Sequence, residues 1–112
     1  MDTDRASLIL ATLLRSPRRF RSFELSKSAK QRLAAIQQLL ETFDKLTFAS
    51  DFEQALAKLN EAYRLLNVHP PPADSTDLTS RQHPMLVAFD NPHPGAETDA
   101  WSALLAELRQ TP

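Results

Sequence analysis

Apolar residues recur at alternating steps of four and three along two stretches in the middle of the chain. The stretches cover residues 28–45 and 51–67. Their members are Ala29, Leu33, Ile36, Leu40 and Phe43 in the first, and Phe52, Leu56, Leu59, Tyr63 and Leu66 in the second. This spacing places each set on one face of an α-helix. Because a short link joins the two stretches, and short links connect antiparallel neighbours, the pattern predicts a helical hairpin over residues 28–67.

Signals for the start of a helix accompany both stripes. Ser28 with Gln31, and Ser50 with Glu53, have the spacing of a capping box, in which each side chain accepts a hydrogen bond from the other residue's free backbone N–H. We therefore expect the two hairpin helices to begin at these serines.

A shorter helix is expected at each end of the chain. Residues 3–15 carry apolar residues at helical spacing after Thr3, and residues 98–109 carry them after Thr98. Threonine favours the N-cap position, because its hydroxyl can accept a hydrogen bond from a free backbone N–H. The sequence thus predicts an all-α fold, a three- to four-helix bundle in which the terminal helices cover the hairpin.

A proline-rich segment interrupts the helical pattern between the hairpin and the last helix. Its prolines are Pro70, Pro71, Pro72, Pro84, Pro92 and Pro94. Proline disfavours helix interiors and favours extended backbone, so we expect a long extended connector, with the apolar island 85–89 laid across the hairpin. The resulting division is a helical domain over 1–67, an extended segment over 68–97, and a helix over 98–110 packed on the same domain.

The glycine and cysteine content limits the fold classes and the kinds of functional site that the chain can form. Gly95 is the one glycine of the chain, whereas sheet proteins need glycine in hairpin turns and bulges. Cysteine is absent, which excludes disulfides, thiolate metal sites and cysteine nucleophiles. No apolar run reaches the roughly 18 residues of a membrane-spanning helix. We expect a cytoplasmic protein without a transmembrane segment.

The sequence contains no recognisable catalytic motif. It has no nucleophile elbow, no zinc-binding H-E-x-x-H and no glycine-rich phosphate loop. Three histidines, His69, His83 and His93, lie in the proline-rich segment, but their spacing matches no metal-ligand motif. We therefore expect no enzymatic activity, no metal and no cofactor.

Charge is divided unevenly between the two parts of the chain. Residues 1–40 contain eight Lys/Arg and three Asp/Glu, whereas the remainder contains five and eleven. The basic residues concentrate in one patch, which we define as Arg15, Arg18, Arg19, Arg21, Lys27, Lys30 and Arg32. Such a patch, interleaved with Phe20 and Phe23, could bind nucleic acid, an acidic protein or a lipid surface. The alternative is a solvated connector whose phenylalanines pack into the core.

Two apolar groups are candidates for binding a partner. They are Met85, Leu86 and Phe89 in the proline-rich segment, and Trp101, Leu104, Leu105 and Leu108 in the last helix. An apolar helix face can dock into a groove on another protein, and tryptophan is a frequent hot-spot residue. The alternative is that both groups complete the core of their own chain.

The hypothesis that these features favour is a non-enzymatic protein-interaction module: an adaptor, an assembly factor or a small subunit of a larger complex. The runner-up is a small nucleic-acid-binding regulator that uses residues 15–32. Self-association is a further expectation, because two hairpins with wide apolar stripes can pair into a four-helix bundle.

Overall fold

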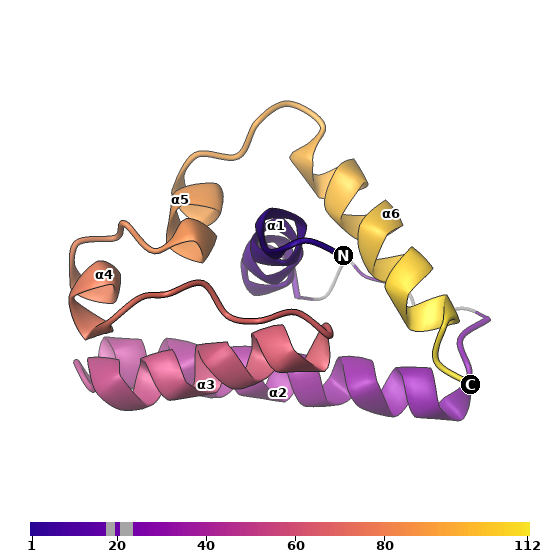
Figure 1. Cartoon of the computed structure of the whole chain (residues 1–112), viewed down its shortest axis with the longest axis horizontal. Coiled ribbons are helices and arrows are strands. Elements are labelled where there is room, and N and C mark those ends of the chain that lie inside the picture. Colours follow the sequence, from indigo (N-terminus) through magenta and orange to yellow (C-terminus); the bar gives the residue numbers. More distant parts are fainter. Residues whose placement is uncertain (18–19, 21–23) are drawn as a thin grey trace.

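The computed structural model describes residues 1–17, 20 and 24–112 and shows an all-α protein (Figure 1). No strand occurs within these ranges. The helices are α1 (Thr3–Arg15), α2 (Lys27–Phe48), α3 (Phe52–Leu65), α4 (Ser75–Thr79), α5 (Pro84–Asp90) and α6 (Ala96–Arg109). The predicted fold class is confirmed, and two short helices are added to it.

The antiparallel hairpin is formed by α2 and α3, which lie side by side along the long axis of the molecule (Figure 1). Most residues of the predicted stripes face the core: Leu33, Ile36, Leu40 and Phe43 are buried on α2, and Leu59, Tyr63 and Leu66 on α3 and its C-cap. Phe52 and Leu56 of the second stripe are half-buried, while Ala55 and Ala62 beside it are buried. The chain reverses over residues 49–51, where Ser50 adopts a left-handed φ of 61°.

Helix α1 crosses over the hairpin, with α5 on one side and α6 on the other (Figure 1). It is buried on most of its circumference, and its core residues include Ile9, Leu10 and Leu13. Its one buried serine, Ser7, is hydrogen bonded through Oγ to the hydroxyl of Tyr63 at 2.5 Å. Burial raises the pKa of Tyr63 to about 12, so the hydroxyl stays neutral and can take part in this bond. Helix α1 thus supplies the cover that the hairpin lacks.

The N-cap of helix α2 lies two residues earlier than the sequence predicts. This N-cap is Ser26, whose Oγ accepts a hydrogen bond from the backbone N–H of Ala29 at 3.1 Å. Ser28 already lies inside the first turn, so the capping box predicted at Ser28 and Gln31 is wrong. Because positions 26 and 28 are both serine, the local sequence does not distinguish between them. Ser26 Oγ also donates to the carbonyl of Thr111 at 3.2 Å, a tertiary contact that favours Ser26 as the N-cap.

Ser26→Ala is therefore expected to lower the free energy of unfolding by about 1 kcal/mol, because it removes the cap of a long core helix. Urea unfolding monitored by circular dichroism measures the change. Ser28→Ala is the matched control and should stay within about 0.5 kcal/mol of the parent protein, as exposed substitutions generally do. An equal loss in both variants, or a larger one at Ser28, would contradict the assignment of Ser26.

The other predicted caps are also displaced by a residue or more. Asp2 Oδ1 accepts from the N–H of Arg5 at 2.7 Å and caps α1 in place of Thr3. Asp51 caps α3 in place of Ser50. Gly95, with φ of 79°, precedes α6 without any side-chain cap, so Thr98 lies within the first turn. In the first two cases a carboxylate stands beside the predicted hydroxyl and provides the stronger, charged acceptor.

The predicted extended connector is wrong over α4 and α5. Asp74 and Asp77 form a capping box that starts α4. Pro84 occupies the first turn of α5, a position where its missing N–H costs nothing, because that N–H has no partner within the helix. The island 85–89 is accordingly helical, and α5 packs against α1. Pro84 thus starts a short helix instead of excluding one.

Candidate binding groove

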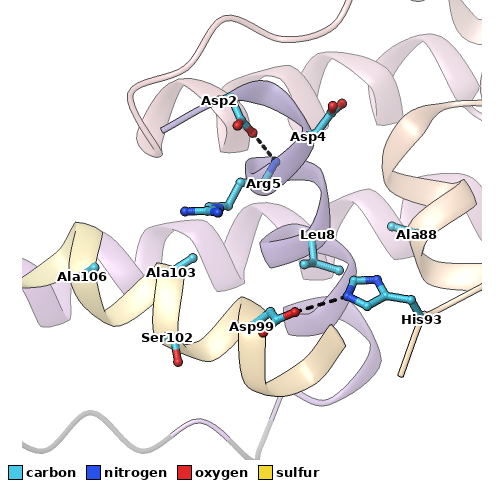
Figure 2. A pocket seen from close by; sticks show the side chains of 10 residues that line it. All are labelled: Asp2, Asp4, Arg5, Leu8, Ala88, His93, Asp99, Ser102, Ala103 and Ala106. Carbon is cyan, nitrogen blue, oxygen red and sulfur yellow. Dashed lines mark hydrogen bonds and ion pairs between the residues drawn. The ribbon is translucent and has the colours of Figure 1, made fainter. Parts of the chain in front are cut away.

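A groove opens between α1, α5 and α6, with a volume of about 730 Å³ (Figure 2). Apolar side chains form part of it, three of them small: Leu8 from α1, Ala88 from α5, and Ala103 and Ala106 from α6. A second cavity, of about 500 Å³, shares Leu8, Ala88 and His93 with the first and extends along α1 as far as Arg15. Together the two cavities make one elongated depression along α1.

Charged side chains border the groove. Asp2, Asp4 and Arg5 come from the N-terminal end of α1, and Asp99 from the first turn of α6. His93 Nε2 lies 3.3 Å from Asp99 Oδ2, and both side chains are exposed (Figure 2). Three carboxylates therefore share this edge with one guanidinium and one imidazole, which gives the groove an acidic balance.

The one serine that lines the groove is not paired with its histidine. Ser102 lines the groove, but the side chain points away from His93, so no serine–histidine pair is formed (Figure 2). Within the described part of the chain, no three histidine or carboxylate side chains are placed to hold a metal ion together. The arrangement suits binding: small apolar residues admit the backbone of a ligand, and the charged edge can fix its orientation.

The described members of the basic patch do not form one surface. The Arg32 side chain is largely buried, and Arg15 places its guanidinium 5.0 Å from the centre of the Phe89 ring, a cation–π contact. Lys27 and Lys30 are exposed on the first turn of α2. Three further members lie outside the described residues: Arg18, Arg19 and Arg21.

Arg32 joins α2, α3 and α6 through a buried network. Its guanidinium donates to Glu107 Oε1 at 2.8 Å, to the carbonyl of Leu65 at 2.5 Å and to Thr111 Oγ1 at 3.0 Å. Asn67 donates to the same Glu107 oxygen at 3.0 Å. Burial alone would raise the pKa of Glu107, but the hydrogen bonds from Arg32 and Asn67 outweigh it and lower that pKa below its ordinary value. Arg32 is thus a structural residue in this conformation.

The apolar candidates lie mainly in the core. Met85, Leu86, Leu104 and Leu108 are buried, whereas Phe89, Trp101 and Leu105 are half-buried. Trp101 stacks against Phe20 with ring centres 5.1 Å apart, and its indole N–H donates to Glu97 at 3.3 Å. Four of the seven residues thus belong to the core of their own chain and the other three pack against it, so a partner-binding role for these groups stays a prediction. Phe23 lies outside the described residues.

His83 is the residue whose role the sequence does not reveal. It is fully buried, and its Nδ1 accepts the N–H of Met85 at 3.1 Å, which caps α5. Nε2 is also buried and has no hydrogen-bond partner among the described residues. The Tyr63 ring lies 6.0 Å away, between ring centres. One sequence signal could have indicated this role. His83 directly precedes Pro84, and proline is favoured at the first position of a helix, directly after the N-cap.

Comparisons with known proteins do not assign the chain to a family: no family model, no curated protein and no solved structure matches it. Within the described residues, no helix is long and apolar enough to span a lipid bilayer. The function must therefore be argued from the groove and the surfaces themselves.

Proposed function

We propose that this chain is a non-enzymatic protein-interaction module that binds a segment of a partner protein in the groove between α1, α5 and α6. The observation that carries the proposal is the groove itself, an open depression with small apolar residues inside and charges along its edge. Protein segments are recognised in such grooves through apolar anchors, while polar contacts at the rim set their orientation.

The chemistry of the edge favours a partner segment with basic residues. Asp4 and Asp99 are exposed on α1 and α6, and together with Asp2 they outnumber the one guanidinium, that of Arg5, which lines the same groove. Charge complementarity of this kind raises the association rate and selects the partner, and its effect decreases with salt.

A peptide library displayed on phage and selected against the immobilised protein tests this proposal. The selected peptides, measured by calorimetry, should bind the parent chain and lose at least ~10-fold in affinity for Ala106→Trp, which fills the groove. Ala57→Trp is the matched control, since Ala57 is an exposed alanine of α3 outside the groove, and it should bind as the parent does. Equal binding by both variants, or no selected peptide, would contradict the proposal.

Nucleic-acid binding by residues 15–32 stays the second hypothesis. Among the patch residues that the structure describes, Lys27 and Lys30 are exposed, and neither takes part in the contacts described for Arg15 and Arg32. A gel-shift series at low salt with single-stranded and duplex DNA and RNA tests it, because phosphate contacts weaken steeply as salt rises. Loss of binding in Lys27→Glu/Lys30→Glu would support this hypothesis, and absence of any shift would exclude it.

A further inference from the structure

Helices α4 and α5 are short and are each docked on one other helix. They contain five and seven residues, and helices of this length are not stable without tertiary contacts. Among the described helices, α5 packs chiefly on α1, and α4 packs chiefly on α3. Proline-containing segments, 70–72 and 92–94, precede and follow the two helices. Short elements with one docking surface belong to the parts of a fold that open locally at a small cost in free energy.

An ion pair joins the two short helices. Arg81, which follows α4, donates from Nε to Oδ2 of Asp90 at 2.7 Å and from Nη2 to Oδ1 at 2.9 Å, and Asp90 is the last residue of α5. The hydrogen bonds from Arg81 lower the pKa of Asp90, so the pair stays charged in mildly acidic solution. We therefore expect α4 and α5 to move as one unit.

His83 is the buried polar residue between the two short helices. It is fully buried, and its Nδ1 accepts the N–H of Met85 at the start of α5. Its Nε2 is buried as well and has no hydrogen-bond partner among the described residues. A protonated ring would carry two N–H donors and a charge into a place that offers no acceptor, which is unfavourable. The docked position of α5 therefore requires a neutral His83.

The titratable groups that act on His83, directly or through Tyr63, come from α1, α3 and α4. On α4, the charge of Asp77 favours the protonated ring but does not offset the burial. On α3, the Tyr63 ring lies 6.0 Å from the His83 ring between centres, and burial keeps its hydroxyl neutral. On α1, Ser7 is hydrogen bonded to Tyr63, and Asp4 acts on Tyr63 through its charge. None of these described groups accepts a hydrogen bond from His83 Nε2.

We propose that α4 and α5 form an acid-releasable wall of the groove between α1, α5 and α6: protonation of His83 favours release of α5 from α1, which removes one side of the groove. Ala88 of α5 lines both cavities of the groove, and His93, which follows α5, does so too. The α6 wall is held separately, through Arg32 and Glu107. The release is a property of the fold, whereas its effect on a bound partner rests on the function proposed above.

Hydrogen exchange of single amides, followed by NMR at low urea concentrations, tests the release in the free chain. The α5 amides should show lower protection factors than the central amides of α2 and α3 and a weaker dependence on urea, because local opening exposes less surface than global unfolding. Burial lowers the pKa of His83 to about 4, against about 6.5 in an open segment. Between pH 7 and pH 5 the protection of the α5 amides should therefore fall roughly 20-fold.

Two histidine variants assign this fall to its source. His83→Asn retains an acceptor for the α5 cap and cannot titrate, so its α5 protection should change less than ~3-fold over the same range. His93→Asn is the matched control, because His93 is an exposed histidine of the groove, and it should keep the fall of the parent chain. Should His83→Asn not fold, the pH and urea profiles of the parent chain decide. Parent α5 amides that are as protected as those of the hairpin, or whose protection does not change with pH, would overturn the proposal.

A peptide selected for the groove tests the coupling to a partner. At pH 7, a peptide at ~100 times its Kd should raise the protection of the α5 amides by at least ~10-fold, because it binds only while α5 is docked. A peptide that binds without changing this protection would overturn the coupling and leave the proposed function intact. Failure to select any peptide would contradict the proposed function, whereas the acid release is decided by the exchange measured in the free chain.

Discussion

Arg32→Ala is expected to lower the free energy of unfolding by about 3 kcal/mol, because removing one partner of a buried ion pair leaves the other charge uncompensated. The side chains of Arg32 and Glu107 are only 15% and 11% exposed. Arg32 also donates to the carbonyl of Leu65 and to Thr111, so its loss frees acceptors on α3 and on the C-terminal residues. The substitution should therefore loosen α6 from the hairpin as well as destabilise the whole fold.

Thermal and urea unfolding measure this loss, and the near-ultraviolet circular dichroism of Trp101 reports whether α6 detaches first. Glu41→Gln is the control, because the Glu41 and Lys45 side chains are 61% and 74% exposed and such a pair contributes less than about 1 kcal/mol. If Arg32→Ala unfolds at the same urea concentration as Glu41→Gln, the buried network does not stabilise the protein as described.

Replacing both partners separates charge from packing. In Arg32→Leu/Glu107→Leu neither charge is left buried alone, so the double variant should be more stable than Arg32→Ala. A double variant that is less stable than Arg32→Ala would show that the hydrogen bonds to Leu65 and Asn67, and not the uncompensated charge, dominate the loss.

Acidification is expected to destabilise the protein through His83. Burial lowers the pKa of His83 to about 4, and the charge of Asp77 opposes this only in part. In the unfolded chain the pKa is about 6.5. Because the folded pKa is depressed, the unfolded state binds the proton more tightly. Above pH ~6.5, neutral His83 therefore makes its full contribution to the free energy of unfolding. This contribution, roughly 3 kcal/mol, is lost as the pH falls toward ~4.

The structure explains why protonation is unfavourable at this position. Nδ1 accepts the N–H of Met85, so in the neutral ring the proton is on Nε2. A second proton would have to enter at Nδ1, which would remove the cap of α5 and place a charge beside the Tyr63 ring. The segment that should open first on acidification is therefore α4–α5, of which α5 covers one side of α1 and α4 packs against α3.

Urea unfolding at several pH values between 7 and 4 measures this effect, in ~0.5-unit steps across the expected titration. His83→Asn retains an acceptor for the α5 cap and cannot titrate, so its stability should fall less with acidification than that of the parent chain. His69→Asn is the matched control at an exposed histidine and should follow the parent. Parallel pH profiles for the parent and His83→Asn would refute the role given to His83.

Periodicity predicted the parts of the fold whose stripes are long and uninterrupted. The stripes ending at Phe43 and Leu66 gave α2 and α3 because their core positions recur with the helical repeat, and the short link fixed the antiparallel return. Cap positions were less well predicted. At the starts of α1, α2 and α3 two candidate hydroxyl or carboxylate side chains lie within two residues of each other, and local sequence does not decide which accepts the bond.

The candidate site lay beyond local sequence reasoning for a different reason. The groove is made by α1, α5 and α6, whose lining residues Leu8, Ala88 and Ala103 are far apart in the chain and are not distinctive individually. The basic patch shows the converse. Arg15 and Arg32 belong to the same predicted patch, yet one packs on Phe89 and the other is largely buried against Glu107.

What the sequence by itself determined is the all-α class and the hairpin, because those depend on helix periodicity and short-range connection. Only the tertiary structure decided the rest: that Met85, Leu86, Leu104 and Leu108 fill the core, that His83 caps a helix, and that Arg32 holds α6 to the hairpin. These outcomes depend on which helices, distant in the sequence, pack against one another. The free energy of burial is gained between two packed elements, so it cannot be read from the sequence of one segment alone.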